Sequence, residues 1–167
     1  MKALLAGIMA LCAALGALAG DRVVVAASSS LQESGFLGYL EPLLKTRADL
    51  SVEWKAAEDS QVIQLARAYE VDAILVSSPE AEDQLMREGV GALMLRVMAQ
   101  GPQEQFSIVV LNPGAGRSPR FDAAMRLLRW LTSSEGQGAI ARFARGGVAP
   151  YQPSAGTETC PACQAQL

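Results

Sequence analysis

The chain has 167 residues, half of them hydrophobic, and the sequence contains no histidine. Without histidine there is no Ser-His or Cys-His nucleophile pair, and the commonest general base and metal ligand is missing. We therefore expect neither a conventional hydrolase nor a zinc enzyme. The 17 acidic side chains outnumber the 14 basic ones, which argues against nucleic acid as a partner. We expect a protein that is not an enzyme and needs no cofactor.

The first 19 residues have the pattern of a secretory signal peptide. A lysine near the start precedes an apolar run over residues 3–18, and residues 17–19 read Ala-Leu-Ala, a typical cleavage site. We predict cleavage after Ala19, which leaves residues 20–167 in the periplasm or outside the cell. An uncleaved membrane anchor needs a longer apolar run, and a lipid anchor at Cys12 needs a smaller residue before it. Without the signal the net charge becomes −4, from 13 basic and 17 acidic side chains, so an anion site must depend on local groups.

Residues 22–47 contain the most informative pattern in the chain. A buried strand is predicted at 23–27 and an amphipathic helix at 36–46, and three hydroxyls lie between them: Ser28, Ser29 and Ser30. Free backbone N–H groups at the start of a helix favour an anion, and serine hydroxyls can donate further hydrogen bonds without adding charge. The alternative is ordinary helix capping, with Ser34 as the N-cap residue.

Alternating strands and helices follow. The periodicity predicts strands at 50–54 and 71–76, helices at 61–69 and 79–88, and a loop at 56–60. Pro79 suits the first turn of the second of these helices. This alternation is typical of a parallel sheet with right-handed crossovers.

The pattern changes in the last third of the chain. Apolar runs at 92–98 and 106–111 flank a polar turn and predict a hairpin or a closely spaced strand pair, with 106–111 inside the sheet. After a turn-rich loop, helices are predicted at 121–131 and 134–144, the latter with capping-box spacing between Ser134 and Gln137. The segment from Tyr151 onward is predicted to be loose.

In this order, five motifs resemble the extracytoplasmic substrate-binding proteins of tungstate and molybdate ABC transporters, the TupA-type branch of the periplasmic binding proteins. The motifs are AASSSLQESGFL at 26–37, DAILVSSPEAE at 72–82, VLNP at 110–113, RWLTSSEGQ at 129–137 and GVAPYQP at 147–153. The similarity extends over roughly residues 22–153. It implies a small oxyanion, tungstate or molybdate, as ligand and an ABC permease or another protein as partner.

The resemblance also implies which residues contact the anion. It places the ligand between the first serine loop and the loop after the second strand, with two lobes closing over it. Together with the third strand's loop, this gives seven candidate ligand-binding residues: Ser28, Ser29, Ser30, Ser34, Ser60, Ser77 and Ser78.

The chain departs from the family in three places. The inserted second lobe, which supplies a basic contact in the family, is replaced by about residues 91–105, far too short for a lobe. The family's small glycine/threonine turn is Glu58-Asp59-Ser60 here, and two carboxylates repel a divalent anion. Ser77 stands where the family often has a histidine. We therefore expect one open lobe that binds weakly, because water competes for each hydrogen bond.

A CxxC motif, Cys160 and Cys163, lies close to the C-terminus. A redox dithiol normally begins a helix after a strand, and a zinc site needs two further ligands that the mature chain does not offer. We expect a local disulfide between Cys160 and Cys163, or crosslinks to another chain that would form a homo-oligomer.

We therefore expect an α/β fold, a single periplasmic-binding-protein-like lobe with a mostly parallel sheet flanked by helices and no second lobe. The expected organisation is a signal peptide at 1–19, the lobe at 20–153 and a flexible cysteine-containing tail at 154–167. Two functions compete. One is an oxyanion-binding protein linked to ABC-type uptake, and the other is a degenerate lobe that acts as a protein-interaction module without ligand transport.

Overall fold

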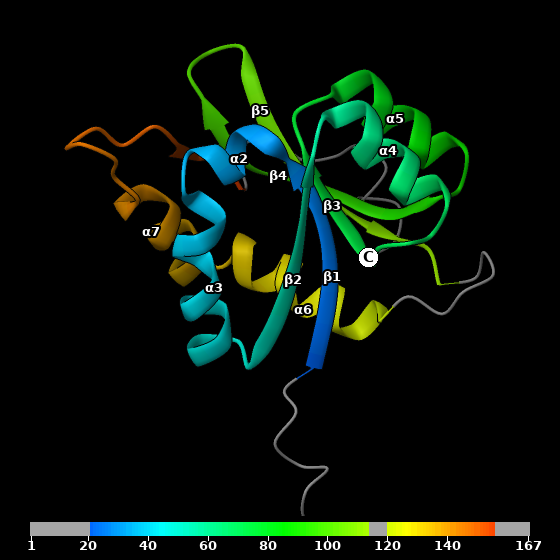
Figure 1. The fold of residues 1–167 in the computed structure, drawn as a ribbon, viewed down its shortest axis with the longest axis horizontal. Helices are drawn as coiled ribbons and strands as arrows, with labels where there is room; N and C mark the ends of the chain where they lie inside the picture. The colour runs from blue at the N-terminus through cyan, green and yellow to red at the C-terminus, as the bar shows by residue number, and fades with distance from the viewer. Residues whose placement is uncertain (1–20, 114–119, 156–167) are drawn as a thin grey trace, which may run out of the picture.

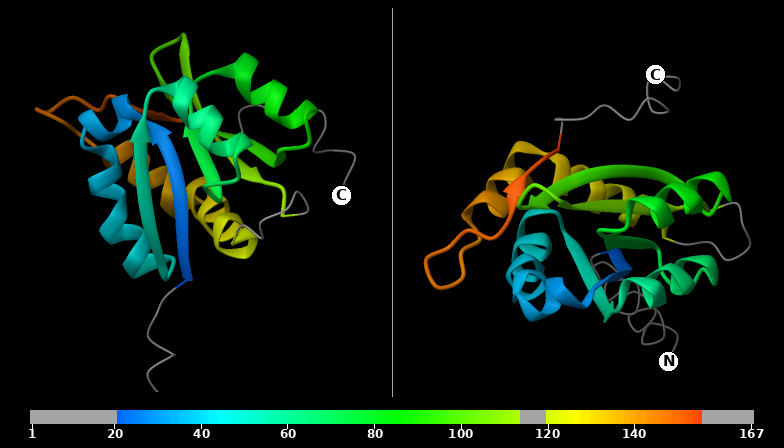
Figure 2. Two further views of the ribbon diagram at one scale, coloured as in Figure 1. Left: turned by 45° about the vertical axis from the view of Figure 1, so that its right-hand side comes forward. Right: turned by 90° about the horizontal axis from the view of Figure 1, so that it is seen from above.

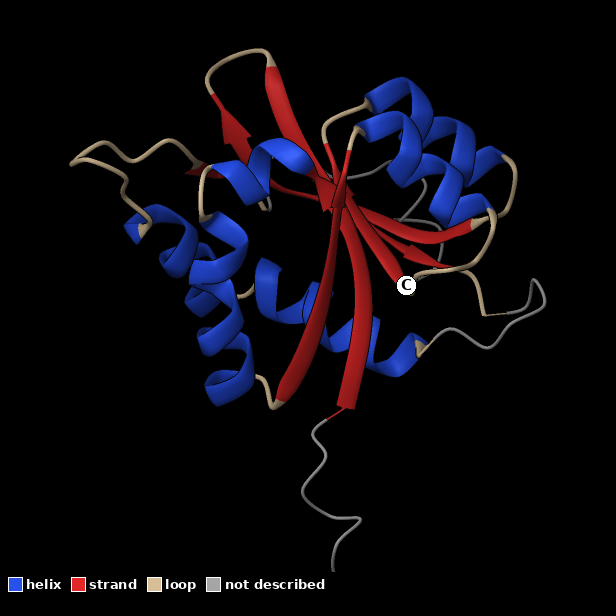
Figure 3. Cartoon of the chain, in the orientation of Figure 1, coloured by secondary structure: helices blue, strands red, loops and turns tan. Residues whose placement is uncertain are grey.

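Six strands form one sheet that carries helices on both faces (Figures 1 and 3). The structure, a computed structural model, describes residues 21–113 and 120–155. The predicted signal peptide and both CxxC cysteines lie outside the described residues. The strands are β1 (Asp21–Ser28), β2 (Leu50–Ala57), β3 (Ala73–Val76), β4 (Gly91–Gln100), β5 (Glu104–Leu111) and β6 (Gln152–Pro153). The helices are α2 (Ser29–Glu33), α3 (Phe36–Arg47), α4 (Asp59–Arg67), α5 (Pro79–Arg87), α6 (Phe121–Thr132) and α7 (Ser134–Arg142).

The sheet has the strand order β2-β1-β3-β5-β4-β6. β1 pairs in parallel with β2 and β3, while β5 pairs antiparallel with β3 and β4, and β6 pairs antiparallel with β4. The expected α/β fold is confirmed, but only β2, β1 and β3 are parallel, so the sheet is mixed rather than mostly parallel. As predicted, β5 lies inside the sheet, where every residue from Phe106 to Leu111 is buried.

Residues 91–105 form a hairpin instead of a second lobe. Gln100 and Glu104 are paired at the tip, and Gly101 has a φ of 66°, a left-handed conformation that glycine adopts without strain. The predicted strand pair is confirmed, and Figure 1 shows the hairpin rising beside α2.

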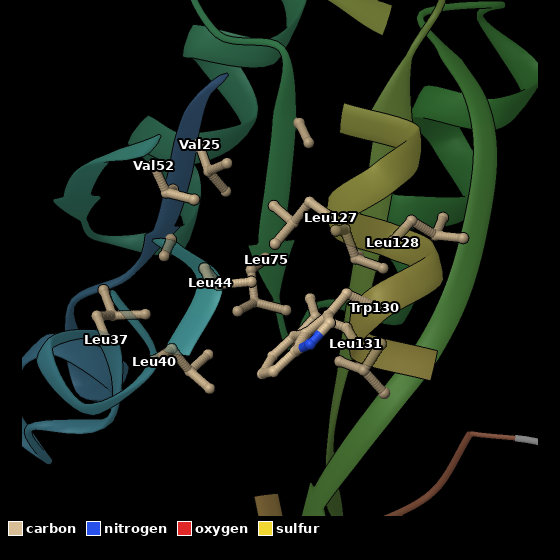
Figure 4. Close-up of a cluster of buried hydrophobic side chains, with 14 of the residues drawn as sticks. Val25, Leu37, Leu40, Leu44, Val52, Leu75, Leu127, Leu128, Trp130 and Leu131 are labelled. Atoms are coloured by element: carbon tan, nitrogen blue, oxygen red, sulfur yellow. The ribbon is translucent and has the colours of Figure 1, made fainter. Parts of the chain in front are cut away.

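Each face of the sheet has its own hydrophobic core, because alternate residues of a strand point to opposite faces. On one face, α3, α6 and α7 pack over Val25 and Leu75, and Figure 4 shows side chains of α3 and α6 in this core. On the other face, α4 and α5 pack over Ala26 and Ile74. Seen from above, the two helix groups lie on opposite sides of the curved sheet (Figure 2).

The segment around Tyr151 is packed, which corrects the expectation of a loose tail beginning there. Tyr151 is buried, and its ring lies edge-on to Phe36 with centroids 4.9 Å apart and stacks on Phe143 at 5.9 Å. The next two residues form β6, which pairs with Met98 and Ala99 of β4. The Ser154 N–H donates to the Val97 carbonyl and the Ala155 N–H donates to Gln137 Oε1, so residues 151–155 pack against the lobe.

A buried carboxylate joins the sheet to the start of α6. Asp72 accepts hydrogen bonds from the backbone N–H groups of Val24 at 2.7 Å and Arg120 at 2.8 Å. The Arg120 guanidinium is 3.9 Å from the same carboxylate. Asp72 thus links β1 and the start of α6, each 48 residues away from it in sequence.

Three local predictions are wrong. Residues 56–60 are not a loop, because β2 continues to Ala57 and α4 begins at Asp59. The N-cap of α7 is Ser133, whose hydroxyl accepts from the Gly136 N–H at 3.1 Å, so Ser134 and Gln137 form no capping box. Ser34 is not an N-cap either, because Gly35 takes that position for α3. No helix in the described part of the chain has the length and hydropathy to cross a membrane.

Candidate functional site

Polar side chains gather at one edge of the sheet, where the three parallel strands end. Ser28 is paired with Ala57, so β1 and β2 end together, and Ser77 and Ser78 directly follow β3. Because Val76 is paired with Ser107 of the antiparallel β5, the tip of the β4–β5 hairpin lies at the same edge. The loops after parallel strands thus meet where the sequence predicts an anion site.

The hydroxyls of the first two serines of the predicted site form hydrogen bonds with carboxylates of the same chain. The buried hydroxyl of Ser28 donates a hydrogen bond to Asp59 Oδ1, and the Ser29 hydroxyl lies 3.3 Å from Glu58 Oε1. Glu58 is the N-cap residue of α4 and Asp59 is its first residue, directly after β2. An oxyanion at Ser28 or Ser29 would have to displace these carboxylates or tolerate their charge.

The loop after β3 is arranged in the same way. The Ser77 hydroxyl donates to Glu104 Oε1 at 3.2 Å, and the Ser78 backbone N–H donates to Glu82 Oε1 at 3.0 Å. Burial raises the pKa of Glu82, while hydrogen bonds from the Ser107 hydroxyl and the Ser78 N–H oppose the rise. Carboxylates thus accept hydrogen bonds from Ser28, Ser29, Ser77 and Ser78.

Ser30 and Ser34 are arranged differently, because both line a pocket of about 340 Å³. The other lining residues come from three segments and are Glu33, Gln100, Arg145, Val148, Pro150 and Tyr151. Ser34 donates to the Leu31 carbonyl at 2.8 Å and accepts from the Phe36 N–H at 3.2 Å. Burial raises the pKa of Tyr151, and a hydrogen bond with Ser34 opposes the rise. The pocket therefore combines hydroxyls, one guanidinium, one carboxylate and an apolar wall.

The sequence predicts that the serine run lies at the N-terminus of a long helix, and this prediction is wrong. Ser29 and Ser30 begin the five-residue helix α2, and the twelve-residue helix α3 starts only at Phe36. The Phe36 N–H already donates to the Ser34 hydroxyl, so it is not a free donor for an anion. Ser60 lies in the first turn of α4 with its side chain exposed, and it is not among the residues that line the pocket.

Sequence reasoning missed Arg145, Tyr151, Glu82 and Glu104. Arg145 follows the last helix and lies on a two-glycine turn in which Arg145 and Val148 bond to each other through their backbones. The glycine pair signalled a turn, but nothing local showed that this turn faces α2, more than 100 residues earlier. In the described part of the chain, no group of three or more His, Cys, Asp or Glu side chains could hold a metal ion.

Comparison with known proteins finds likeness in structure alone. No family model matches the sequence, and no curated protein matches it. Among solved structures, the tungstate-binding protein TupA from Desulfovibrio alaskensis superimposes with a TM-score of 0.77 and 14% identity, covering 81% of this chain and 99% of that chain. The fold is a single periplasmic-binding-protein-like lobe.

Two further solved structures share this fold. The tungstate ABC transporter structure from Geobacter sulfurreducens gives a TM-score of 0.68 at 15% identity and covers 75% of this chain and all of that chain. The substrate-binding domain of a proposed molybdenum ABC transporter from Clostridium difficile gives 0.59 at 9% identity, covering 79% and 98%. At these identities the likeness establishes the fold and leaves the ligand of this chain to be argued from its own residues.

Proposed function

We propose that this chain is an extracytoplasmic solute-binding-like protein for a small oxyanion of the tungstate and molybdate class, linked to ABC-type uptake and without enzymatic activity. The observation that carries the proposal is the meeting of serine hydroxyls from two strand ends, Ser28–Ser30 after β1 and Ser77–Ser78 after β3, at one edge of the sheet. The structural neighbours include a tungstate-binding protein, a tungstate ABC transporter and a substrate-binding domain of a proposed molybdenum transporter, which supports the ligand class.

The charges at this edge determine how tightly an anion is held. Each hydrogen bond to an anion contributes on the order of 0.5–1.5 kcal/mol when water competes, so three or four give a Kd near the millimolar range. Glu58 and Asp59 weaken binding further, because they lie beside the hydroxyls of Ser29 and Ser28. We therefore propose a weak, charge-limited site.

Calorimetric titration tests the proposal directly. The mature chain is titrated with tungstate, molybdate, sulfate and phosphate at fixed salt, and heat at millimolar tungstate or molybdate is expected. The double variant Glu58→Gln, Asp59→Asn should bind more tightly, because the nearest repulsive charges are removed. The matched control Glu41→Gln, Asp122→Asn removes the same charge from exposed positions on α3 and α6 and should bind like wild type.

The absence of binding in both proteins would refute the proposal. If neither wild type nor the Glu58→Gln, Asp59→Asn variant gives heat or a thermal shift at millimolar anion, this edge does not bind oxyanions and the proposal is wrong.

A second candidate function is favoured by the same carboxylates. Four of the seven predicted ligand contacts, Ser28, Ser29, Ser77 and Ser78, already bond to Asp59, Glu58, Glu104 and Glu82. Because these groups already donate to carboxylates of the same chain, they are less available to an anion, which favours a degenerate lobe that acts as a protein-interaction module. Crosslinking through Cys160 and Cys163 would detect a partner or a second copy, and a chain that stays uncrosslinked under oxidising conditions would count against this candidate.

A further inference from the structure

The pocket between α2 and residues 145–151 differs from the rest of the polar edge in its charge. Ser28, Ser29 and Ser77 each donate to a carboxylate, whereas Ser30 and Ser34 share a hollow with a guanidinium, that of Arg145. A water molecule occupies about 30 Å³ in the liquid, so 340 Å³ accommodates a tetrahedral oxyanion together with part of its hydration shell.

Arg145 is held in place on both sides. Its backbone pairs with Val148 through two hydrogen bonds, of 2.8 and 3.1 Å, that close the turn over Gly146 and Gly147. Both glycines have left-handed φ values, 60° and 83°, as a tight hairpin turn of this kind requires. Phe143 precedes the turn and Tyr151 follows it, and both are buried in the aromatic cluster around Phe36. The turn that carries Arg145 is therefore anchored at both ends, by Phe143 and by Tyr151.

The Arg145 guanidinium has donors to spare. Its Nη1 donates to the Glu33 carbonyl at 3.0 Å, which uses one of five N–H groups. Arg22, Arg67 and Arg120 each form an ion pair with a carboxylate, but across residues 21–113 and 120–155 Arg145 forms none. A guanidinium with free donors beside the Ser30 hydroxyl suits an oxyanion, because charge-assisted hydrogen bonds are about twice as strong as neutral ones.

We propose that Arg145 and the hydroxyl of Ser30 supply the strongest contacts to the oxyanion at this edge. Ser28, Ser29 and Ser77, which donate to carboxylates, and Ser34, which donates to the Leu31 carbonyl, contribute less. This inference rests on the proposed function and assigns it to one part of the edge. The Glu33 carboxylate at the pocket lining opposes binding, because it places a negative charge near the ligand.

The test is a titration of the mature chain with tungstate at fixed salt. Arg145→Gln is compared with Arg142→Gln, which removes the same charge from an exposed position at the end of α7. Arg145→Gln should weaken binding about tenfold or more, as expected for a charge-assisted contact, while Arg142→Gln should bind within about twofold of wild type, as a screened surface charge. Ser30→Ala should weaken binding more than Ser29→Ala, and Glu33→Gln should strengthen it.

Each outcome decides between the claims. If wild type binds tungstate and Arg145→Gln binds equally well, this assignment is wrong and the proposed function stands. Equal losses in Arg145→Gln and Arg142→Gln would also overturn the assignment, because they would show an effect of overall charge. No binding by wild type or by the Glu58→Gln, Asp59→Asn variant overturns both. Urea unfolding of each variant separates lost binding from lost folding.

Discussion

Replacing Asp72 by alanine should destabilise the lobe strongly, because two backbone N–H groups lose their acceptor. The Val24 N–H lies within the sheet, where an unmet donor costs about 1–3 kcal/mol. The Arg120 N–H lies at the exposed start of α6, where water can partly replace the carboxylate, so its loss costs about 0.5–1.5 kcal/mol. The two losses together come to about 1.5–4.5 kcal/mol.

The ion pair between Asp72 and Arg120 should contribute much less. The Arg120 side chain is half exposed and 3.9 Å from the carboxylate, so Arg120→Gln, which keeps the backbone N–H, should cost less than about 1 kcal/mol.

Urea unfolding of Asp72→Ala, Arg120→Gln and the exposed control Asp122→Ala measures these differences. If Arg120→Gln loses as much stability as Asp72→Ala, or if Asp72→Ala loses less than about 1 kcal/mol, the argument from backbone acceptors is refuted.

Two further predictions concern Glu82 and the N-terminus. Because burial raises the pKa of Glu82 above 4.5, its folded form holds a proton more tightly than its unfolded form, so its contribution to stability falls as pH rises above about 4.5. Glu82→Gln should therefore be more stable than wild type at pH 7 and equal to it below pH 4.5 in urea unfolding, whereas an advantage that grows as pH falls would contradict this. Exported protein should begin at Gly20 by intact mass, and a cytoplasmic chain that retains Met1 would show the signal-peptide prediction to be wrong.

The strands and long helices could be predicted because each has a clear apolar period. The run Ala73–Val76 is buried at every position, and the buried face of α6 includes Leu127 and Leu131. Short elements lacked this signal. α2 buries only Leu31, so nothing in its sequence separates it from a polar loop. The start of α4 at Asp59 was missed because its first residues are polar and resemble a loop.

The candidate site could be predicted in outline only. That Ser28 and Ser77 lie at one edge follows from parallel strands, which end on the same side. The partners of these hydroxyls do not follow from local sequence, because Glu58 and Glu104 reach them through the register of β2 and β5. Arg145 and Glu33 are 112 residues apart, and their contact depends on how the last turn folds back over α2.

The paired ends of the β4–β5 hairpin make the chain a natural acceptor for an inserted domain. Gln100 and Glu104 are opposite each other in the ladder, so a domain whose own termini lie close together can replace the three-residue turn between them without changing any strand register. Such a graft would stand directly above the ends of β1 and β3, because the hairpin tip lies at that edge. A domain inserted at this turn would therefore cover the polar edge of the sheet, and tungstate titration of the fused and unfused chains would show whether covering the edge changes binding.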